Sequence, residues 1–547
     1  MRIALAQLNY HIGNFASNTD KIIHAVNKAK EEKADLIVFA ELAVSGYPPR
    51  DFLEFDDFID CCNDSLRTIA THCVGIAAIV GVPTYNRNDK GKRLFNTAAF
   101  LDEGEVKTMI GKTLLPNYDV FDEYRYFEPN RKFETVQYQG VSIAITICED
   151  LWNITDDPLY VVNPVDELMK MKPGLLINIA ASPFNYKQAE KRKQILCKNA
   201  ATYRLPLFYV NHIGAQTELL FDGGSLVVDP TGKVRDELAY FEEDFRVYNL
   251  HDVVNRISDN EYKPVAKPKV ELIHDALVMG VRNYFGKLGF KKAILGLSGG
   301  IDSAVTLVLA CRALGNENVR AILLPSPFSS DHSVDDAIAL AENVNCPFDI
   351  IHIDDAYNTF VRTLEPYFRG LPFNIAEENI QARVRAVILM AFTNKFGYIL
   401  LNTSNKSEAA VGYGTLYGDM CGGLSVLGDV YKTEVYELAE FINKDGVLIP
   451  LNTINKPPSA ELRFGQKDSD SLPDYDILDK ILFQYLEELK SPKQIIAIGF
   501  DEAIVRKTLK LVNTNEYKRY QTPPVLRVSP KAFGMGRRMP IVGRYLS

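Results

Sequence analysis

The stretch Leu295-Gly-Leu-Ser-Gly-Gly-Ile-Asp-Ser-Ala304 decides the fold class of the C-terminal half of this chain. The apolar run 292–297 that leads into it predicts a buried parallel strand, and the helix-period run 304–314 that leaves it predicts a helix. A turn of small residues between strand and helix aims backbone N–H groups and the positive end of the helix dipole at one point. This arrangement is typical of a phosphate-binding loop.

The residue types within this loop strengthen that interpretation. Gly299 and Gly300 leave the backbone open to a phosphate, Ser298 and Ser303 can add hydroxyl donors, and Asp302 can hold a magnesium ion against the phosphates. A Gly-Lys-Ser/Thr ending is absent, which excludes the common P-loop. The Ser-Gly-Gly-x-Asp-Ser pattern is similar to the pyrophosphate-binding loop of the ATP pyrophosphatases, which cleave ATP to AMP and pyrophosphate. The alternative is an ordinary glycine-rich turn.

Strand and helix patterns alternate along the whole C-terminal half. The alternating segments are residues 292–297, 302–314, 319–324, 333–345, 349–353, 377–396 and 398–401. Because parallel strands need crossover connections, this order predicts a doubly wound, Rossmann-like parallel sheet.

Short apolar runs dominate the N-terminal half, with helix-period stretches at residues 17–30 and 188–203. The apolar runs are residues 2–6, 36–40, 75–82, 142–147, 175–179, 207–210 and 225–228. This pattern predicts a second α/β domain with large sheets.

The length and one proline-containing segment suggest where the domains divide. A chain of 547 residues is too long for one core, since domains average about 150 residues. The charged segment 261–269 contains two prolines and suits a linker. We therefore expect domains over residues 1–255 and 273–547, a linker over 256–272, and a helical, basic tail at the C-terminus.

Composition excludes several function classes. The net charge of −9 predicts no general attraction to nucleic acid or to an anionic membrane. Eight scattered cysteines without a Cys-x-x-Cys pair argue against a zinc site or a disulfide framework, and suit a reducing cytosol. Neither a signal peptide nor a membrane-spanning run is seen. We expect a cytoplasmic protein that acts on small molecules.

Three residues in the N-terminal half stand just past strand patterns: Glu41, Lys112 and Cys148. A carboxylate, an ammonium and a thiol make a workable amidase. The carboxylate takes the thiol proton, the thiolate attacks the carbonyl carbon, and the ammonium stabilises the oxyanion. A nearby lysine should also lower the pKa of the thiol. Taken singly, each residue could be ordinary packing or surface.

This set resembles the Glu-Lys-Cys triad of the nitrilase superfamily, and the resemblance covers residues 1 to about 250. It implies an α-β-β-α sandwich fold. The segments 115–118 and 181–184 resemble the glutaminase branch, which implies that Tyr118 and Ser182 hold a glutamine substrate. At position 188 the family usually has a basic residue, whereas this chain has Gln188 next to Lys187, and an amide there could still bind the substrate carboxylate.

Motifs in the C-terminal half resemble the NAD synthetase family. They lie at residues 377–385, 401–408, 418–423, 429–438, 458–474 and 516–524. The resemblance implies contacts to deamido-NAD at Asn379, Glu408 and Lys518, and magnesium ligation by Asp302 and Glu408. It implies ATP contacts at Gly296, Leu297, Ser298, Gly299, Gly300, Ile301, Asp302, Ser303 and Thr403.

With both halves present, the chain resembles the glutamine-dependent NAD(+) synthetases, ligases that amidate deamido-NAD through an acyl-adenylate. The resemblance implies ATP as co-substrate, Mg²⁺, ammonia from L-glutamine, and a homo-oligomer. Three alternatives remain open. The chain could be another ATP-pyrophosphatase amidotransferase or thiolation enzyme, a synthetase whose nitrilase domain is inactive and which uses free ammonia, or a nucleotide-binding regulatory protein.

Overall fold

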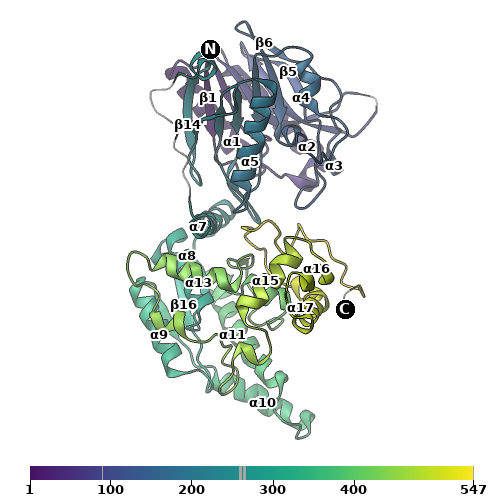
Figure 1. The fold of residues 1–547 in the computed structure, drawn as a ribbon. Coiled ribbons are helices and arrows are strands. Elements are labelled where there is room, and N and C mark those ends of the chain that lie inside the picture. Colours follow the sequence, from purple (N-terminus) through teal and green to yellow (C-terminus); the bar gives the residue numbers. More distant parts are fainter. Residues whose placement is uncertain (89, 258–261, 263–266, 546–547) are drawn as a thin grey trace. The chain divides into compact units, whose positions relative to one another are not determined.

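A computed structural model describes residues 1–88, 90–257, 262 and 267–545 (Figure 1). The chain divides into two compact units, Met1–Ala266 and Lys267–Ser547. Residues 258–261 and 263–266 of the expected linker, 256–272, lie outside the described residues. Its last residues belong to helix α7 (Lys269–Leu288), which opens the second unit. The expected domain limits stay a prediction.

Two six-stranded sheets build the first unit. One has the strand order β14-β1-β2-β3-β4-β5 and consists of β1 (Arg2–Gln7), β2 (Leu36–Val38), β3 (Ala77–Tyr85), β4 (Leu94–Asp102), β5 (Glu105–Gly111) and β14 (Asp244–Asn249). The other has the order β13-β12-β9-β8-β7-β6 and consists of β6 (Val136–Tyr138), β7 (Val141–Ile147), β8 (Leu175–Ile179), β9 (Leu207–Val210), β12 (Leu226–Val228) and β13 (Val234–Glu237). A separate hairpin pairs β10 (Ile213–Gln216) with β11 (Leu219–Asp222).

Helices cover the outer faces of this pair of sheets. The helices described in this unit are α1 (Phe15–Glu31), α2 (Asp56–Thr71), α3 (Glu123–Tyr126), α4 (Pro164–Met169), α5 (Gln188–Tyr203) and α6 (Leu250–Asn255), with short 3₁₀ turns η1 (Arg50–Glu54) and η2 (Cys148–Leu151). The sheets face each other, because β1 contacts β9 and both β4 and β5 contact β7; α2 packs on the first sheet and α5 on the second. The α-β-β-α sandwich expected from the resemblance is confirmed.

The second unit contains one five-stranded, all-parallel sheet with the order β17-β16-β15-β18-β19. Its strands are β15 (Ala293–Gly296), β16 (Val319–Leu323), β17 (Phe348–Ile350), β18 (Ile399–Asn402) and β19 (Leu424–Ser425). The chain runs outward from β15 to β17 and then returns to β18 on the other side of β15. The strand order therefore reverses between β15 and β18, and parallel sheets bind ligands at the carboxyl ends flanking such a point.

Twelve helices of the described chain belong to this unit. They are α7, α8 (Ile301–Leu314), α9 (Asp331–Asn343), α10 (Asp354–Phe368), α11 (Ile375–Phe396), α12 (Lys406–Val411), α13 (Lys432–Ile442), α14 (Leu451–Asn455), α15 (Tyr475–Leu486), α16 (Pro492–Ala497), α17 (Glu502–Thr514) and α18 (Glu516–Arg519), with 3₁₀ turns η3 (Asn316–Asn318) and η4 (Asp468–Asp470). The predicted parallel sheet is confirmed. The sequence interpretation left out α10, although apolar residues recur in it at helical spacing between Tyr357 and Phe368. In the structure this helix buries only Tyr357.

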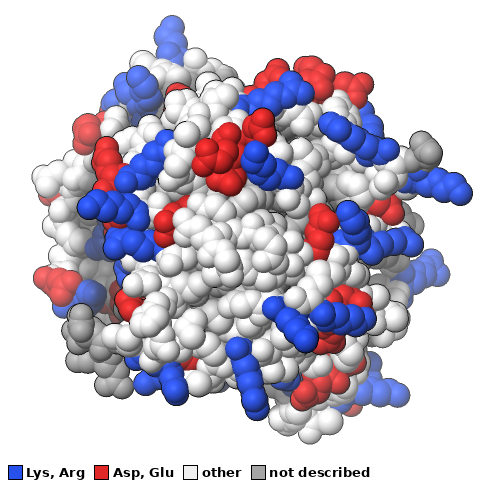
Figure 2. Space-filling view, turned by 90° about the horizontal axis from the view of Figure 1, so that it is seen from above, with Lys and Arg blue, Asp and Glu red and all other residues white. Residues whose placement is uncertain are grey.

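The surface carries both signs of charge. On the face that Figure 2 shows, Lys and Arg side chains alternate with Asp and Glu around a central area of other residues. Among the described helices, none combines the length and the apolar character that crossing a bilayer requires. The expectations that the protein binds no nucleic acid and is cytoplasmic stay predictions.

Candidate active sites

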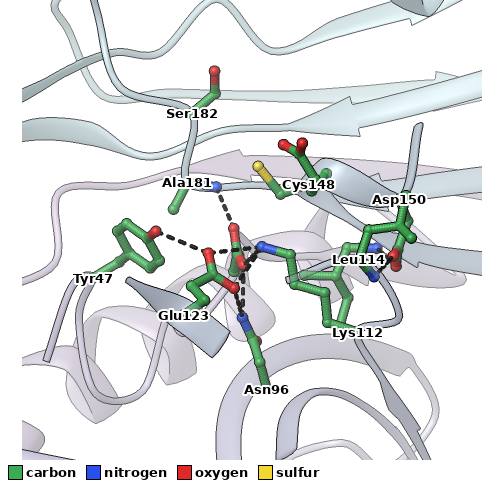
Figure 3. Close-up of polar contacts among 12 residues, drawn as sticks. Tyr47, Asn96, Lys112, Leu114, Glu123, Cys148, Asp150, Ala181 and Ser182 are labelled. Carbon is green, nitrogen blue, oxygen red and sulfur yellow. Dashed lines mark hydrogen bonds and ion pairs between the residues drawn. The ribbon is translucent and has the colours of Figure 1, made fainter. Parts of the chain in front are cut away.

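Strand ends from both sheets of the first unit converge on one buried site (Figure 3). Lys112 directly follows β5 and Cys148 directly follows β7. The Lys112 ammonium donates a hydrogen bond of 2.7 Å to Glu41 Oε1, and both side chains are fully buried. The Cys148 thiol interacts electrostatically with both. The structure therefore brings the three predicted catalytic residues together.

A glycine places Glu41. The backbone on either side of Glu41 lies so close to β3 that a Cβ on Gly81 would come within 2.3 Å of the Leu42 nitrogen and 2.4 Å of the Ala40 oxygen. The Glu41 carboxylate is then oriented by the Ala181 N–H, which donates to Oε2 over 2.9 Å. Any larger residue at position 81 would push the carboxylate out of place.

Lys112 is held by a second carboxylate that the sequence interpretation left without a role. Its ammonium lies 2.8 Å from both oxygens of Glu123. Tyr47 donates to Glu123 Oε1 over 2.9 Å, and Asn96 donates to Glu41 Oε1 over 2.7 Å (Figure 3). Burial, with a further contribution from Glu41, raises the pKa of Glu123. Glu123 lies in the four-residue helix α3, which is too short to leave a periodic signal.

Cys148 adopts an unusual backbone conformation. Its φ is +43°, in the left-handed region that non-glycine residues seldom occupy. Such strain is retained where surrounding structure enforces it, and it is common at functional sites. Burial raises the pKa of the Cys148 thiol well above its ordinary value, Glu41 raises it further, and Lys112 lowers it only in part. Lys112 thus lowers the pKa of this thiol as expected, but burial and the Glu41 charge outweigh it, so the net shift is upward.

Asp150 ties the two halves of this site together. It accepts hydrogen bonds from the N–H groups of Thr113 and Leu114 at 3.0 and 2.8 Å, and from that of Ile147 at 3.0 Å. The backbone after the lysine and the backbone before the cysteine thus share one carboxylate. Burial raises the pKa of Asp150 to about 7, although the three N–H donors oppose this.

Glu149, the residue after the cysteine, accepts hydrogen bonds from two tyrosines. Glu149 Oε1 accepts hydrogen bonds from Tyr118 at 2.8 Å and from Tyr160 at 3.1 Å. Glu149 is buried, and burial raises its pKa, whereas Tyr118 is 41% exposed. Tyr118, one of the predicted glutamine-binding residues, thus links the surface to the buried carboxylate beside the thiol.

The other two predicted glutamine-binding residues are Ser182 and Gln188. Ser182 is buried, its N–H donates to Asn211 Oδ1 over 2.8 Å, and its side chain points away from Lys112 in Figure 3. Gln188 is the first residue of α5, and its Oε1 accepts a weak hydrogen bond of 3.4 Å from Asn185. The part of all three residues in binding glutamine stays a prediction.

In the second unit, the Ser-Gly-Gly loop connects β15 to the N-terminus of α8, as predicted. Ser303 Oγ lies 3.2 Å from Ser298 Oγ and donates to the Gly300 carbonyl over 2.9 Å. Gly299 has φ +80°, and a Cβ there would lie 2.1 Å from the Ser333 carbonyl oxygen. Glycine is therefore required at 299 by both conformation and space.

The predicted ATP-binding residues flank the point where the strand order reverses. Gly296 ends β15, and Thr403 directly follows β18 on the neighbouring strand. Leu297 and Ile301 are buried, so their side chains pack in the core and only their main chain is available to a ligand. This edge of the sheet is where a parallel α/β fold presents a nucleotide site.

A charged cluster lies at the same edge. Asp302 Oδ2 accepts a hydrogen bond of 2.5 Å from Lys432, and Asp302 Oδ1 accepts one of 2.8 Å from Asn405. The Lys432 ammonium is also 3.5 Å from Glu408 Oε1. Burial raises the pKa of Glu408, and the Asp302 carboxylate adds to this. The sequence interpretation quoted the motif around Lys432 without assigning that residue a role.

The predicted deamido-NAD residues surround the loop after α12. Lys518 donates to the carbonyls of Gly412 and Gly414 over 2.7 and 3.0 Å. Asn379 accepts a hydrogen bond of 2.7 Å from Thr415 in the same loop. Glu408 lies in α12 itself. The structure brings the three residues to one loop, and their contacts to a substrate stay predictions.

A cavity adjoins this loop. It is lined by Asn402, Ser404, Glu408, Ala409, Gly412, Tyr413, Gly414, Met420, Ser425, Gly428, Arg519, Thr522, Val525 and Phe533. Its walls therefore come from the carboxyl ends of β18 and β19, from α12, and from the C-terminal segment. Glu408 thus lines the same cavity as Arg519, Thr522, Val525 and Phe533 of the C-terminal segment.

Comparison with known proteins matches both units. The carbon-nitrogen hydrolase family model fits residues 2–254, and the NAD synthase model fits residues 273–522. The chain is 44% identical to a glutamine-dependent NAD(+) synthetase of Synechocystis sp. over 546 residues, which cover 98% of each chain. A relative from Acinetobacter baylyi with the same description is 42% identical over 99% of this chain and 98% of its own.

A solved structure of a relative matches the fold of nearly the whole chain. The glutamine-dependent NAD+ synthetase of Acinetobacter baumannii, in complex with adenosine diphosphate, has a TM-score of 0.78 and 39% identity, and covers 99% of this chain and 98% of that one. Since relatives at this level of identity match nearly every residue, and since both family models fit in order, the chain belongs to the glutamine-dependent NAD(+) synthetase family.

Proposed function

We propose that this protein amidates deamido-NAD to NAD, using ATP and the amide nitrogen of L-glutamine, and releases AMP, pyrophosphate and glutamate. One observation carries the proposal. A single chain of this family holds both a buried Cys-Glu-Lys group and a glycine loop that faces an Asp-Lys-Glu cluster. The first group suits amide hydrolysis, and the second suits chemistry on a triphosphate.

In the first unit, Glu41 acts as the base. Since the pKa of the Cys148 thiol is raised, the thiol is neutral at physiological pH and must lose its proton as it attacks the amide carbon of glutamine. Glu41 accepts that proton and returns it to the leaving nitrogen, which departs as ammonia. Water then hydrolyses the thioester to glutamate. The buried Lys112 ammonium stabilises the oxyanion.

Recognition of glutamine needs groups that bind its carboxylate and its ammonium group. We assign this role to Tyr118, Ser182 and Gln188, together with Glu149. Glu149 is a buried carboxylate whose present partners are two tyrosine hydroxyls. A carboxylate that accepts only neutral donors can also take the ammonium group of an amino acid.

In the second unit, the chain's own groups bind and orient the nucleotide. The N–H groups of the 298–300 loop and the start of α8 bind the β- and γ-phosphates, and the Lys432 ammonium offsets their charge. The nicotinate carboxylate attacks the α-phosphorus, and pyrophosphate leaves. Ammonia then attacks the carbonyl carbon of the acyl-adenylate, which releases AMP and forms the amide of NAD.

Magnesium fits the donor set that we assign to it, Asp302 and Glu408. Both are carboxylates at the nucleotide edge of the sheet, and Mg²⁺ is commonly bound by one or two carboxylates plus substrate phosphates. The described part of the chain has no group of three or more His, Cys, Asp or Glu residues placed to hold a metal. The ion would therefore depend on ATP for the rest of its ligands. When bound, Mg²⁺ would neutralise charge on the departing pyrophosphate.

The test is a product assay with purified protein. ATP, Mg²⁺, L-glutamine and deamido-NAD should give NAD and AMP in equal amounts. Replacing deamido-NAD by aspartate or XMP should abolish AMP release, whereas AMP release with either of these acceptors would favour another amidotransferase. If NAD forms from ammonium but not from glutamine, the first unit is inactive. Formation of ADP in place of AMP would contradict the proposal.

A further inference from the structure

Behind the synthetase site lies a buried ion cluster that the mechanism above does not use. The Lys406 ammonium is 3.0 Å from Asp429 Oδ1 and 2.9 Å from Glu487 Oε1, and it donates to Ser529 Oγ over 2.7 Å. The side chains of Lys406 and Asp429 are fully buried, and that of Glu487 is 1% exposed. An ammonium has three protons, and here each has an acceptor.

The Asp429 carboxylate, like the Lys406 ammonium, has hydrogen-bond partners for each of its polar atoms. Its Oδ2 accepts hydrogen bonds from the N–H groups of Val528 and Ser529 at 2.8 and 2.7 Å, and its Oδ1 accepts one of 2.7 Å from Ser529 Oγ. The carboxylate therefore fixes the backbone of residues 528–529, which lie about a hundred positions later in the chain.

The two charged residues sit on the backbone segments that carry the site. Lys406 follows Asn405, and Asp429 precedes Lys432 by three residues. Asn405 and Lys432 both donate to Asp302, one to each oxygen. The N–H of Lys406 also donates to the carbonyl of Val430 over 2.9 Å. The segments 405–406 and 429–432 thus each contribute one residue that contacts Asp302 and one residue that belongs to the ion cluster.

The cluster also holds one wall of the cavity that adjoins the loop after α12. Just before the residues that Asp429 binds, Pro524 accepts a hydrogen bond of 2.8 Å from the N–H of Ser425 in β19. Val525 and Phe533, on either side of Ser529, line the cavity that also contains Glu408. The C-terminal segment is therefore fastened to the segments that carry Glu408 and Lys432.

Stability alone does not account for such a cluster. Desolvating charged groups costs about as much as their attraction returns, so apolar residues of similar volume often give equal or greater stability. What hydrogen-bonded ions add is a fixed geometry, since each donor has one direction and one partner. We propose that the cluster of Lys406, Asp429 and Ser529 positions groups for the synthetase reaction. It fixes Glu408, Lys432 and the C-terminal segment that lines the cavity in place relative to Asp302. The inference rests on the proposed function.

The test uses Asp429→Asn, which keeps the shape and removes the charge, and Ser529→Ala, which removes one hydroxyl. NAD formation is followed with ammonium as the nitrogen source. Because small misplacements of reacting groups cost up to about 10²-fold in rate, Asp429→Asn should lower kcat/KM for ATP by about 10- to 100-fold and raise the Mg²⁺ concentration needed for half-maximal rate. Ser529→Ala should lower kcat/KM by about threefold or more.

The matched control is Arg320→Met, which breaks an ion pair of 2.6 Å to Asp349 between β16 and β17. It should lower the thermal midpoint and leave the kinetic constants unchanged. If folded Asp429→Asn likewise loses only thermal stability, the cluster is purely structural and the inference fails. If that variant does not fold, wild-type constants in Ser529→Ala would overturn the inference. Failure of the wild type to form NAD in this assay would instead overturn the proposed function.

Discussion

Each of the two candidate active sites has a lysine between two carboxylates, and the side chains of the two sites differ in their exposure to solvent. In the first unit Lys112 lies between Glu41 and Glu123, whose side chains are 0% and 6% exposed. In the second unit Lys432 lies between Asp302 and Glu408, which are 16% and 17% exposed. The same trio of charges is therefore sealed in one unit and open in the other.

The difference matches what each site has to handle. A sealed cluster keeps protons on defined atoms and strengthens electrostatic interactions, which suits hydrolysis of a neutral amide by a thiol that needs a base. An open cluster can admit phosphates and a cation, because a partly solvated carboxylate can exchange one positive partner for another. Four predictions separate the two environments, in order of falling effect.

The largest effect is expected for Cys148→Ala. Removing the nucleophile should lower glutamine-driven NAD formation by about 10⁴-fold. Ammonium-driven NAD formation should remain near wild type, since the second unit holds its own cluster. Both rates are measured on the same preparation. An equal fall in both would mean that the two sites cannot be separated.

Asp302→Ala should affect both nitrogen sources alike. It removes a partner of Lys432 and a proposed Mg²⁺ ligand, and losing one preorganised electrostatic group costs about 10²- to 10³-fold. Pyrophosphate release should fall by that factor with glutamine and with ammonium. If this variant released pyrophosphate at the wild-type rate, the cluster of Asp302, Lys432 and Glu408 would not be the site that acts on ATP.

Glu123→Gln tests the sealed cluster through a residue that does not touch the thiol. Lys112 would keep Glu41 and lose its second charged partner. We expect glutamine hydrolysis to fall by about 10²-fold, since the ammonium is then less firmly placed. The matched control is Glu105→Gln, a surface carboxylate that is 73% exposed and should show wild-type hydrolysis. Identical rates of glutamine hydrolysis in the two variants would mean that Glu123 does not help to position Lys112 for the reaction.

The smallest effect concerns the pH at which the thiol ionises. Burial and the Glu41 charge raise the pKa of Cys148. An ordinary thiol ionises at a pH of about 8.5, and the Cys148 thiolate should be absent at that pH. Glu41→Gln removes a negative charge and should shift the appearance of the thiolate to lower pH. The measurement is the ultraviolet absorbance of the thiolate relative to Cys148→Ser. A shift to higher pH would reverse the sign of the Glu41 contribution.

The sequence predicted those parts of both sites that follow strands or a glycine loop. Lys112 and Cys148 lie at strand ends because the apolar periodicity places them there. For the same reason Ser298 to Gly300 lie between β15 and α8, and Asp302 and Ser303 lie in the first turn of α8. Glu123 was missed because it follows no strand and lies in a single helical turn.

The acidity of the thiol could not be predicted in the same way. A motif indicates that Cys148 and Lys112 are close together, but the balance of burial and neighbouring charge decides the sign of a pKa shift. The role of Gly81 was equally hidden, because an added Cβ there would clash with residues 40–42, which are distant in the sequence. Residues whose roles depend on packing thus required the structure.

The most direct test of the central claim follows one oxygen atom. Deamido-NAD with ¹⁸O in its nicotinate carboxylate is incubated with the protein, ATP, Mg²⁺ and glutamine, and the products are analysed by mass spectrometry. If the carboxylate attacks the α-phosphorus, one labelled oxygen should appear in AMP and none in pyrophosphate. Unlabelled AMP, or label in inorganic phosphate formed together with ADP, would contradict an acyl-adenylate made at the open cluster.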